Sequence, residues 1–398
     1  MPAIVGFLIA LGVAFCQNRK RSFSEKMEDV THSMGDSNVM IMCLVFVMAG
    51  GFSGAVQAAG GVDSTVNFSL SILPPSVAVA GLFIIGCFIS TAMGTSVGTI
   101  AALAPIAVGI SDKTGIAGAL CIGAVVSGAM FGDNLSFISD TTIAACNGQG
   151  CEMKDKFKAN FFIVLPAAII TVLIFWLATR NMSFQLEENL NYSLWEVLPY
   201  MVVLLGALIG INVFVVLISG IVISLIVGVS MGHIALSEMF QVVGSGVTSM
   251  YDITVISIIV ACIVSLVKEH GGIQFILNLI KSNINGRRGA EFGIALLALF
   301  VDACTANNTV AIVMTGPIAK EISEEFDVDP RRSASLLDMF TSVGQGIIPY
   351  GAQLLSAATL TGLTPLQIIP NLYYPLLMGV CGILAIIFLP QSRKTTTN

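Results

Sequence analysis

The sequence AGALCIGAVVSGAMF at residues 117–131 leads directly into GDNLSFISDTT at residues 132–142, and the order of these two stretches decides the fold. The first stretch has no charged residue, and a helix that crosses a bilayer needs about 20 predominantly apolar residues. The second is polar, yet no lysine follows until Lys154. We therefore expect a helix that breaks at membrane depth, where irregular backbone survives only beside protein or water. The alternative is a surface loop beside a short helix.

The composition of the whole chain is that of a membrane protein. Of its 398 residues, 55% are hydrophobic and 11% are charged, and the mean hydropathy of +0.90 separates it from ordinary soluble domains. The longest hydrophilic stretch, residues 17–38, is too short for a domain with its own core. We predict one all-α, multi-pass membrane domain over residues 1–398, with the lipid bilayer around it and no nucleic-acid partner.

Lysine and arginine cluster in some of the connectors between apolar runs. The positive-inside rule makes these connectors cytoplasmic, and we expect the protein in the inner (plasma) membrane of its cell. The clusters are Arg19–Lys26, Lys154–Lys158, Lys281–Arg288, Arg331–Arg332 and Arg393–Lys394. The nine cysteines lack zinc-ligand spacing and mostly lie inside apolar runs, so we expect no cofactor and no disulfide framework.

Two apolar runs, residues 75–111 and 289–323, are too long for one span and too interrupted for two ordinary ones. The first is interrupted by GTSVGT at residues 94–99, and the second by TANNT at residues 305–309. Two short helices that meet at a polar tip form a re-entrant hairpin, so each run predicts one. Helix length alone supports these two hairpins, because full crossings of the membrane fit the charge distribution equally well.

Each predicted hairpin leads into a second interrupted segment, and this pattern recurs along the chain. A shift of 212 residues, the separation of Gly81 and Gly293, places the break at 132–142 on GQGIIPYGAQ at residues 344–353. The same shift superposes Pro105 on Pro317 and Gly132 on Gly344. An odd number of spans between the copies turns the second upside down, a recurring plan of secondary transporters. We predict inverted repeats, about 1–180 and 194–390; the alternative is chance similarity between apolar sequences.

An aspartate at membrane depth costs roughly 2.5–3.5 kcal/mol on insertion scales, so it is a functional candidate. Asp133 and Asp140 both lie in the break at 132–142. The oxygen-bearing residues around them suit a hard cation rather than a soft metal. These residues are Asn134, Ser136, Ser139, Thr141 and Thr142. We predict that Asp133 and Asp140 bind either sodium or protons.

The second half of the chain supplies further candidates for ion or proton binding. Asp302, Asn307 and Asn308 lie at the second hairpin tip, and Asp338 lies on the helix before the second break. Asn307 or Asn308 could instead cap the next helix, and Asp338 could be the structural partner of a polar group on a neighbouring helix. Secondary candidates are Thr95, Ser96, Thr305 and Gln345. Since Gln345 takes the place of Asp133 in the second copy, the predicted site is charged on one side only.

Two motifs resemble those of a known family. GAMFGDNLSFISDTTIAA at residues 128–145, followed by GCE at 150–152, resembles the signature of NhaC-type sodium/proton antiporters in the ion-transporter superfamily. SASLLDMFTSVGQGIIPYGAQLLSA at residues 333–357 is similar to the C-terminal half of that family. The resemblance covers nearly the whole chain from about Val39. It implies a scaffold with a transport body, a homodimer, and exchange of a cation for protons. Phe137 departs from the proline that relatives commonly carry.

The mechanism we expect is competition between sodium and protons for the two aspartates, with the transport body carrying the occupied site between the membrane faces. Carboxylates crowded in a low dielectric take up protons readily, and no ATP-binding loop is present in the sequence. One alternative keeps the fold and moves an organic acid or an amino acid with sodium or protons. Another is an intramembrane aspartyl protease using Tyr251-Asp252 and Gly132-Asp133, but their order is reversed relative to that family. We expect a transporter and not an enzyme.

Overall fold

Helices are the regular elements of this computed structural model, which describes residues 3–72, 74–136, 139–182, 190–272, 275, 278, 284 and 286–389. The helices of the first half are α1 (Ala3–Cys16), α2 (Phe23–Met34), α3 (Ser37–Ala58), α4 (Gly61–Ile72), α5 (Pro75–Met93), α6 (Ser96–Thr114), α7 (Gly118–Leu135), α8 (Asp140–Gln149) and α9 (Met153–Thr179). Those of the second half are α10 (Leu194–Leu208), α11 (Val213–Ser230), η1 (Leu236–Glu238), α12 (Met239–Ser249), α13 (Tyr251–Glu269), α15 (Gly286–Thr305), α16 (Asn308–Glu325), α17 (Pro330–Ile347), α18 (Ala352–Thr361), α19 (Pro365–Ile368), η2 (Ile369–Asn371) and α20 (Tyr373–Phe388).

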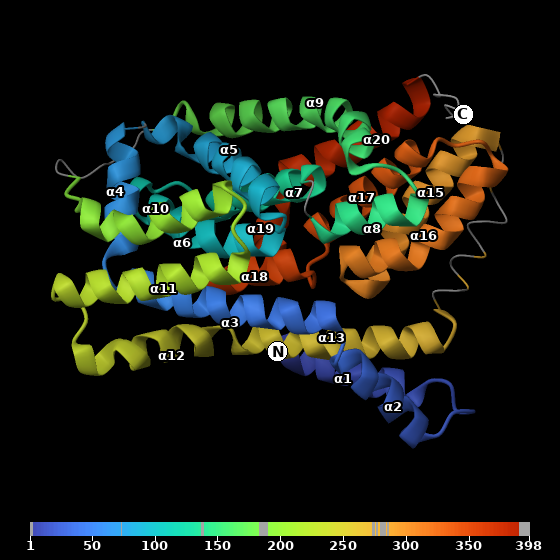
Figure 1. Cartoon of the computed structure of the whole chain (residues 1–398), viewed down its shortest axis with the longest axis horizontal. Coiled ribbons are helices and arrows are strands. Elements are labelled where there is room, and N and C mark those ends of the chain that lie inside the picture. Colours follow the sequence, from blue (N-terminus) through green and yellow to red (C-terminus); the bar gives the residue numbers. More distant parts are fainter. Residues whose placement is uncertain are drawn as a thin grey trace.

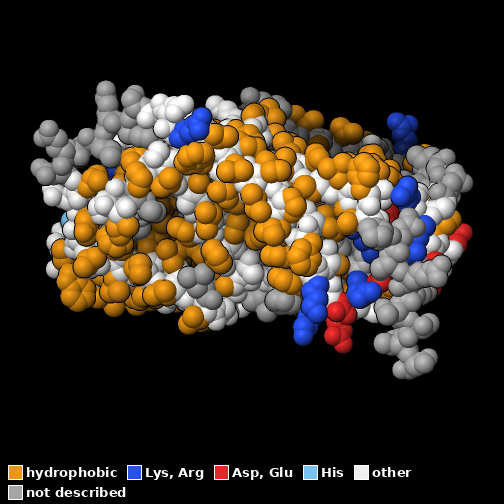
Figure 2. All heavy atoms as spheres, turned by 90° about the horizontal axis from the view of Figure 1, so that it is seen from above, with side chains coloured by type: hydrophobic (Ala, Val, Ile, Leu, Met, Phe, Trp, Pro, Cys, Tyr) orange, Lys and Arg blue, Asp and Glu red, His pale blue; other side chains and the backbone are white. Residues whose placement is uncertain are grey.

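The length and apolar character of these helices fit a bilayer. Within the described residues, six helical segments are long and apolar enough to cross a membrane, and a seventh is added when α19, η2 and α20 count as one bent span. Figure 2 shows hydrophobic side chains over the broad middle of the molecule and most of the charged ones at one end. Large apolar side chains such as those of Phe88 and Phe162 are exposed, as expected of a surface that faces lipid. The prediction of an all-α, multi-pass membrane protein is confirmed.

Two groups of helices make up the molecule. Along one edge, α3 lies side by side with α11, α12 and α13, and α1 and α2 pack on α13 (Figure 1). The other group contains the two predicted hairpins and the two interrupted segments. In it α7 packs between α5 and α6, and α17 packs between α15 and α16. The interrupted segments are therefore enclosed by protein, which is where broken helices can lie.

The helix bounds repeat at the predicted offset. Adding 212 to the bounds of α7 and α8 gives the bounds of α17 and α18. The shift also relates the contacts between the two halves. Helix α6 packs against α18, and its counterpart α16 packs against α8, the counterpart of α18. The inversion of the second copy and the re-entrant course of the hairpins stay predictions.

The breaks at the two hairpin tips have local causes. Gly94 ends α5 in the left-handed conformation that glycine adopts without strain (φ 68°). The Thr95 side chain then caps α6 by accepting from the Gly98 N–H at 3.4 Å. At the second tip Ala306 has a φ of 51°, and Asn307 caps α16 by accepting from the Val310 N–H at 3.0 Å. The capping role considered for Asn307 is therefore present.

Glycines allow α5 and α7 to approach closely, so substitutions inside and outside this contact should differ in their effect on stability. A Cβ at Gly128 would lie 3.1 Å from the Cα of Gly86 and closer still to the carbonyl oxygen of Phe83, whereas a Cβ at Gly81 on α5 would meet nothing within 4 Å. We expect Gly128→Ala to lower the free energy of unfolding by about 1–3 kcal/mol, and Gly81→Ala to leave it unchanged or raise it by up to about 1 kcal/mol. Thermal unfolding in detergent measures both; equal stability of the two variants would contradict the predicted clash.

Candidate functional site

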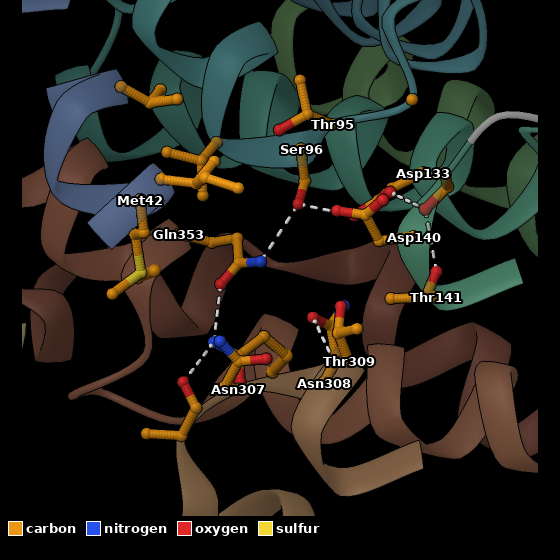
Figure 3. A pocket seen from close by; sticks show the side chains of 18 residues that line it. Met42, Thr95, Ser96, Asp133, Asp140, Thr141, Asn307, Asn308, Thr309 and Gln353 are labelled. Atoms are coloured by element: carbon orange, nitrogen blue, oxygen red, sulfur yellow. Dashed lines mark hydrogen bonds between the residues drawn. The ribbon is translucent and has the colours of Figure 1, made fainter. Parts of the chain in front are cut away.

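A cavity of about 120 Å³ lies where residues of both halves of the chain meet (Figure 3). Its lining follows the 212-residue offset. The corresponding pairs are Gly94 and Ala306, Thr95 and Asn307, Ser96 and Asn308, Val97 and Thr309, Asp133 and Gln345, Asp140 and Ala352, and Thr141 and Gln353. We call this cavity the central pocket. Corresponding residues of the two halves thus form the two sides of the pocket, and the first half contributes carboxylates, whereas the second half contributes amides.

Four helices begin at the central pocket. Ser96, Asp140, Asn308 and Ala352 are the first residues of α6, α8, α16 and α18, and all four line it. Helix N-termini carry partial positive charge and N–H groups without helical partners. Helix ends of this kind favour negative charge, whether of the pocket carboxylates or of a bound anion.

Asp133 is the buried carboxylate of the central pocket. It lies in the last turn of α7 with 5% of its side chain exposed. The Ser96 hydroxyl donates to its Oδ2 at 2.7 Å, and the Ser139 hydroxyl donates to its Oδ1 at 2.6 Å. Thr141 extends this group, since its Oγ1 lies 2.9 Å from that of Ser139. Among the described residues no lysine, arginine or histidine forms an ion pair with Asp133, so neutral hydroxyl groups surround its charge.

Asp140 differs from Asp133 in exposure. It is the first residue of α8, and its side chain is exposed toward the same pocket. In Figure 3 the two aspartates lie on one side of the pocket, with Asn307 and Asn308 on the other. The pocket therefore has one buried and one accessible carboxylate.

The amide side of the pocket is joined to Asp133 by hydrogen bonds. Gln353 Nε2 donates to Ser96 Oγ at 3.0 Å, and Gln345 Nε2 donates to Gln353 Oε1 at 2.8 Å and to the Ala306 carbonyl at 3.1 Å. This network runs from the carboxylate to the second hairpin tip. Gln345 is among the residues predicted from the sequence, whereas Gln353 is not, although the 212-residue shift pairs it with the candidate Thr141.

The side chain of Asn308 forms a hydrogen bond through its oxygen but not through its nitrogen. Its side-chain oxygen accepts from the Thr309 N–H at 3.0 Å, while its buried Nδ2 has no hydrogen-bond partner among the described residues. An unpaired buried donor is costly. Asn308 lines the pocket, so this donor could serve an acceptor atom of a bound molecule or a water.

A separate polar cluster surrounds Lys156, and several predicted site residues belong to it instead. Lys156 is 1% exposed and forms an ion pair with Asp338, which is fully buried. Its ammonium group also donates to the Asn134 carbonyl at 2.7 Å and to Thr142 Oγ1 at 3.0 Å. Asn160, one helical turn further along α9, donates to Asn134 Oδ1 at 2.6 Å. Asp338 thus has the structural partner considered as its alternative role.

The position of Lys156 differs from the prediction. The local sequence predicts a solvated cytoplasmic connector for Lys154, Lys156 and Lys158, of which only Lys154 and Lys158 are exposed. Lys156 is buried because α9 begins at Met153 and turns this side chain toward Asp338 on α17. The available signal was Asn160, four residues later and hence on the same helix face. Of the other candidates near this break, Ser136 is buried without lining the pocket, and Phe137 lies outside the described residues.

Asp302 and Thr305 also lie apart from Asp133. Asp302 is fully buried in the last turn of α15 and does not line the central pocket. The Thr305 hydroxyl donates to the Asn307 carbonyl at 3.2 Å, and Thr305 lines a different cavity of about 390 Å³ between the two groups of helices. The residues predicted to form one site therefore lie in separate places, chiefly the central pocket, the Lys156 cluster and the surroundings of Asp302.

Residues 2–179 and 187–390 match the Na+/H+ antiporter family. The chain belongs to this family. Its NhaC-type resemblance is confirmed, because two of its relatives are antiporters named NhaC. Membership of the Na+/H+ antiporter family points to a transporter rather than an enzyme, and Asp252, the second aspartate of the protease alternative, is exposed at the start of α13 and does not line the central pocket.

The names of relatives of this chain state different transported substances. The chain is 20% identical to the Na(+)/H(+) antiporter NhaC of Bacillus subtilis over 88% of this chain and 84% of the relative. It is 22% identical to the Malate-2H(+)/Na(+)-lactate antiporter of the same organism, over 88% and 81%. It is also 22% identical to the arginine/ornithine antiporter ArcD of Halobacterium salinarum, over 91% and 82%.

Proposed function

We propose that this antiporter exchanges sodium for protons at Asp133 and Asp140 in the central pocket. The observation that carries the proposal is a buried carboxylate that hydroxyl groups surround and that no described basic residue neutralises. A small monovalent cation fits this setting, because hard cations prefer oxygen ligands. Ser96, Ser139 and Thr141 supply such oxygens beside the two carboxylates.

Competition for the same charge couples the two ions. When sodium occupies the pocket, the carboxylates stay ionised, and when sodium leaves, protons replace it, because an uncompensated charge is unfavourable away from water. The transport body then presents the loaded pocket to the other membrane face. We further propose a homodimer in the inner (plasma) membrane, with the basic connectors on the cytoplasmic side.

Proteoliposomes with a pH-sensitive dye test this proposal directly. Under an imposed pH gradient, added sodium is expected to produce saturable dequenching, and lithium or potassium define the selectivity. Protein-free liposomes are the control. A purified, folded protein that gives no cation-dependent proton movement would overturn the proposal.

A second candidate function is the exchange of an organic acid or an amino acid. The four helix N-termini and the unpaired Asn308 amide favour it, because both can hold a carboxylate group. The names of two relatives include such cargo. Uptake of labelled lactate, malate or arginine without sodium-dependent dequenching would select this function; dequenching by sodium alone would exclude it.

A further inference from the structure

Asp302 is a carboxylate that the fold buries without a partner. Its side chain is 0% exposed, and neither Oδ1 nor Oδ2 has a hydrogen-bond partner within the described part of the chain. It packs against Gly344 on α17, where an added Cβ would lie 2.5 Å from Oδ2. A buried carboxylate without donors is strongly disfavoured in its charged form.

The residue that corresponds to Asp302 in the first half of the chain shows which hydrogen bond this position can form. The 212-residue shift places Asp302 on Ser90 and Gly344 on Gly132, and Ser90 packs on Gly132 as Asp302 packs on Gly344. The Ser90 hydroxyl donates to the Ala129 carbonyl at 2.6 Å. A single O–H donor therefore satisfies the position. A carboxylic acid supplies such a donor only while it holds its proton. The same shift places Thr341 on Ala129, so the Thr341 carbonyl is the acceptor expected for it.

We propose that Asp302 is a proton-binding site distinct from the central pocket, and that its proton is one of those exchanged for sodium. The proposal rests on the proposed sodium/proton exchange. In the loaded state the neutral acid packs against α17. On release the O–H bond breaks, the electron pair stays on the carboxylate, and the proton passes to water. The carboxylate that remains must then be exposed to water or recover a proton.

Two contacts link this site to the central pocket. Gly344, which packs on Asp302, precedes Gln345, and Gln345 donates to the Ala306 carbonyl at the hairpin tip. Thr305, in the same last turn of α15, lines the cavity of about 390 Å³, and Asn307 lines both that cavity and the central pocket. Movement that brings water from this cavity to Asp302 would therefore move the lining of the sodium pocket.

The groups around Asp302 leave its charge uncompensated. The helices that pack against α15 are α13, α16, α17 and α20, and in the described residues none of them forms an ion pair with Asp302. The titratable groups beside it are Cys304 and Tyr350, whose hydroxyl donates to the Ala303 carbonyl at 2.6 Å. The cavity of about 390 Å³, which Asp302 does not line, has these charged and titratable groups in its lining: Asp29, His32, Asp36, Lys268 and Glu269.

The test is the number of protons exchanged per sodium ion, measured in proteoliposomes as the sodium gradient that balances an imposed pH gradient. Asp302→Asn and Asp302→Ser should exchange one proton fewer per sodium ion than the unchanged protein. They should still bind ²²Na+, because Asp302 does not line the pocket. Asp302→Ser reproduces the first half of the chain and serves if the asparagine variant does not fold. Ser90→Ala is the matched control and should keep the original ratio.

Infrared spectroscopy provides a second readout. Sodium binding should remove a carboxylic-acid C=O band from the spectrum of the unchanged protein, and that loss should be smaller in Asp302→Asn. An unchanged exchange ratio in both Asp302 variants, or loss of ²²Na+ binding together with exchange, would overturn the proton site while sodium/proton exchange itself stands. Absence of sodium-dependent proton movement in the unchanged protein would instead overturn the proposed function.

Discussion

Asp133→Asn is expected to abolish sodium-dependent proton movement in proteoliposomes while the protein still folds. Asparagine has nearly the same shape and can still accept from Ser96 or Ser139, so the end of α7 keeps its packing. The negative charge is lost, however, and truncating one partner of a buried charge contact typically costs about 2–5 kcal/mol. At about 1.4 kcal/mol per tenfold, sodium affinity should fall by roughly two orders of magnitude.

The matched control for Asp133→Asn is Asp252→Asn. Asp252 is also an aspartate of a membrane helix, but it is exposed at the start of α13, so its variant should exchange ions normally. Thermal unfolding of both variants separates a lost site from a lost fold. Normal exchange by a folded Asp133→Asn protein would remove Asp133 from the site.

Lys156→Met is expected to destabilise the protein strongly. The substitution keeps the length of the side chain but leaves Asp338 buried and uncompensated, and breaking a buried ion pair costs about 3–5 kcal/mol. It also removes the donor to the Asn134 carbonyl, which lies at the end of α7. Thermal unfolding in detergent should show a marked drop in midpoint. The result would be contradicted by a variant that unfolds together with the unchanged protein.

The double variant Lys156→Met with Asp338→Leu isolates the ion pair from other effects. Replacing both partners by apolar residues is often neutral or stabilising, so it should recover much of the stability lost in Lys156→Met. Lys158→Met is the control on the same helix, because Lys158 is exposed, and it should leave stability unchanged. A double variant no more stable than Lys156→Met would show that the lysine acts through its contacts with α7 and α8 instead.

The helix breaks could be predicted from the sequence because their causes are local. Gly94 and Thr95 end one helix and cap the next within two residues, and the break after Leu135 lies between an apolar run and a polar one. Asp133 and Asp140 could be assigned to one pocket because they flank the same short connection. Neighbours in sequence at a helix break remain neighbours in space.

The sequence does not predict the surroundings of Lys156 and Asp302, because distant parts of the chain form them. Lys156 is buried by Asp338, which is 182 residues away, while the rule that assigns lysines to cytoplasmic connectors considers only the local run. The closeness of Asp302 to Asn307 in sequence predicts a place at the hairpin tip. Asp302 lies one helical turn earlier, however, and successive turns of a helix direct side chains to different neighbours.

The absence of a basic partner for Asp133 among the described residues has an electrical consequence. With Lys156 matched by Asp338, the two pocket carboxylates give the empty carrier a surplus negative charge. A charge that moves through the membrane potential changes its energy by about 2.3 kcal/mol per 100 mV. A pocket that holds one sodium ion keeps one negative charge, whereas a pocket with a proton on each carboxylate is neutral. Voltage would therefore act more strongly on the passage of the sodium-loaded pocket than on that of the proton-loaded one, so the resting potential of the cell, as well as the ion concentrations, would help set the direction of exchange.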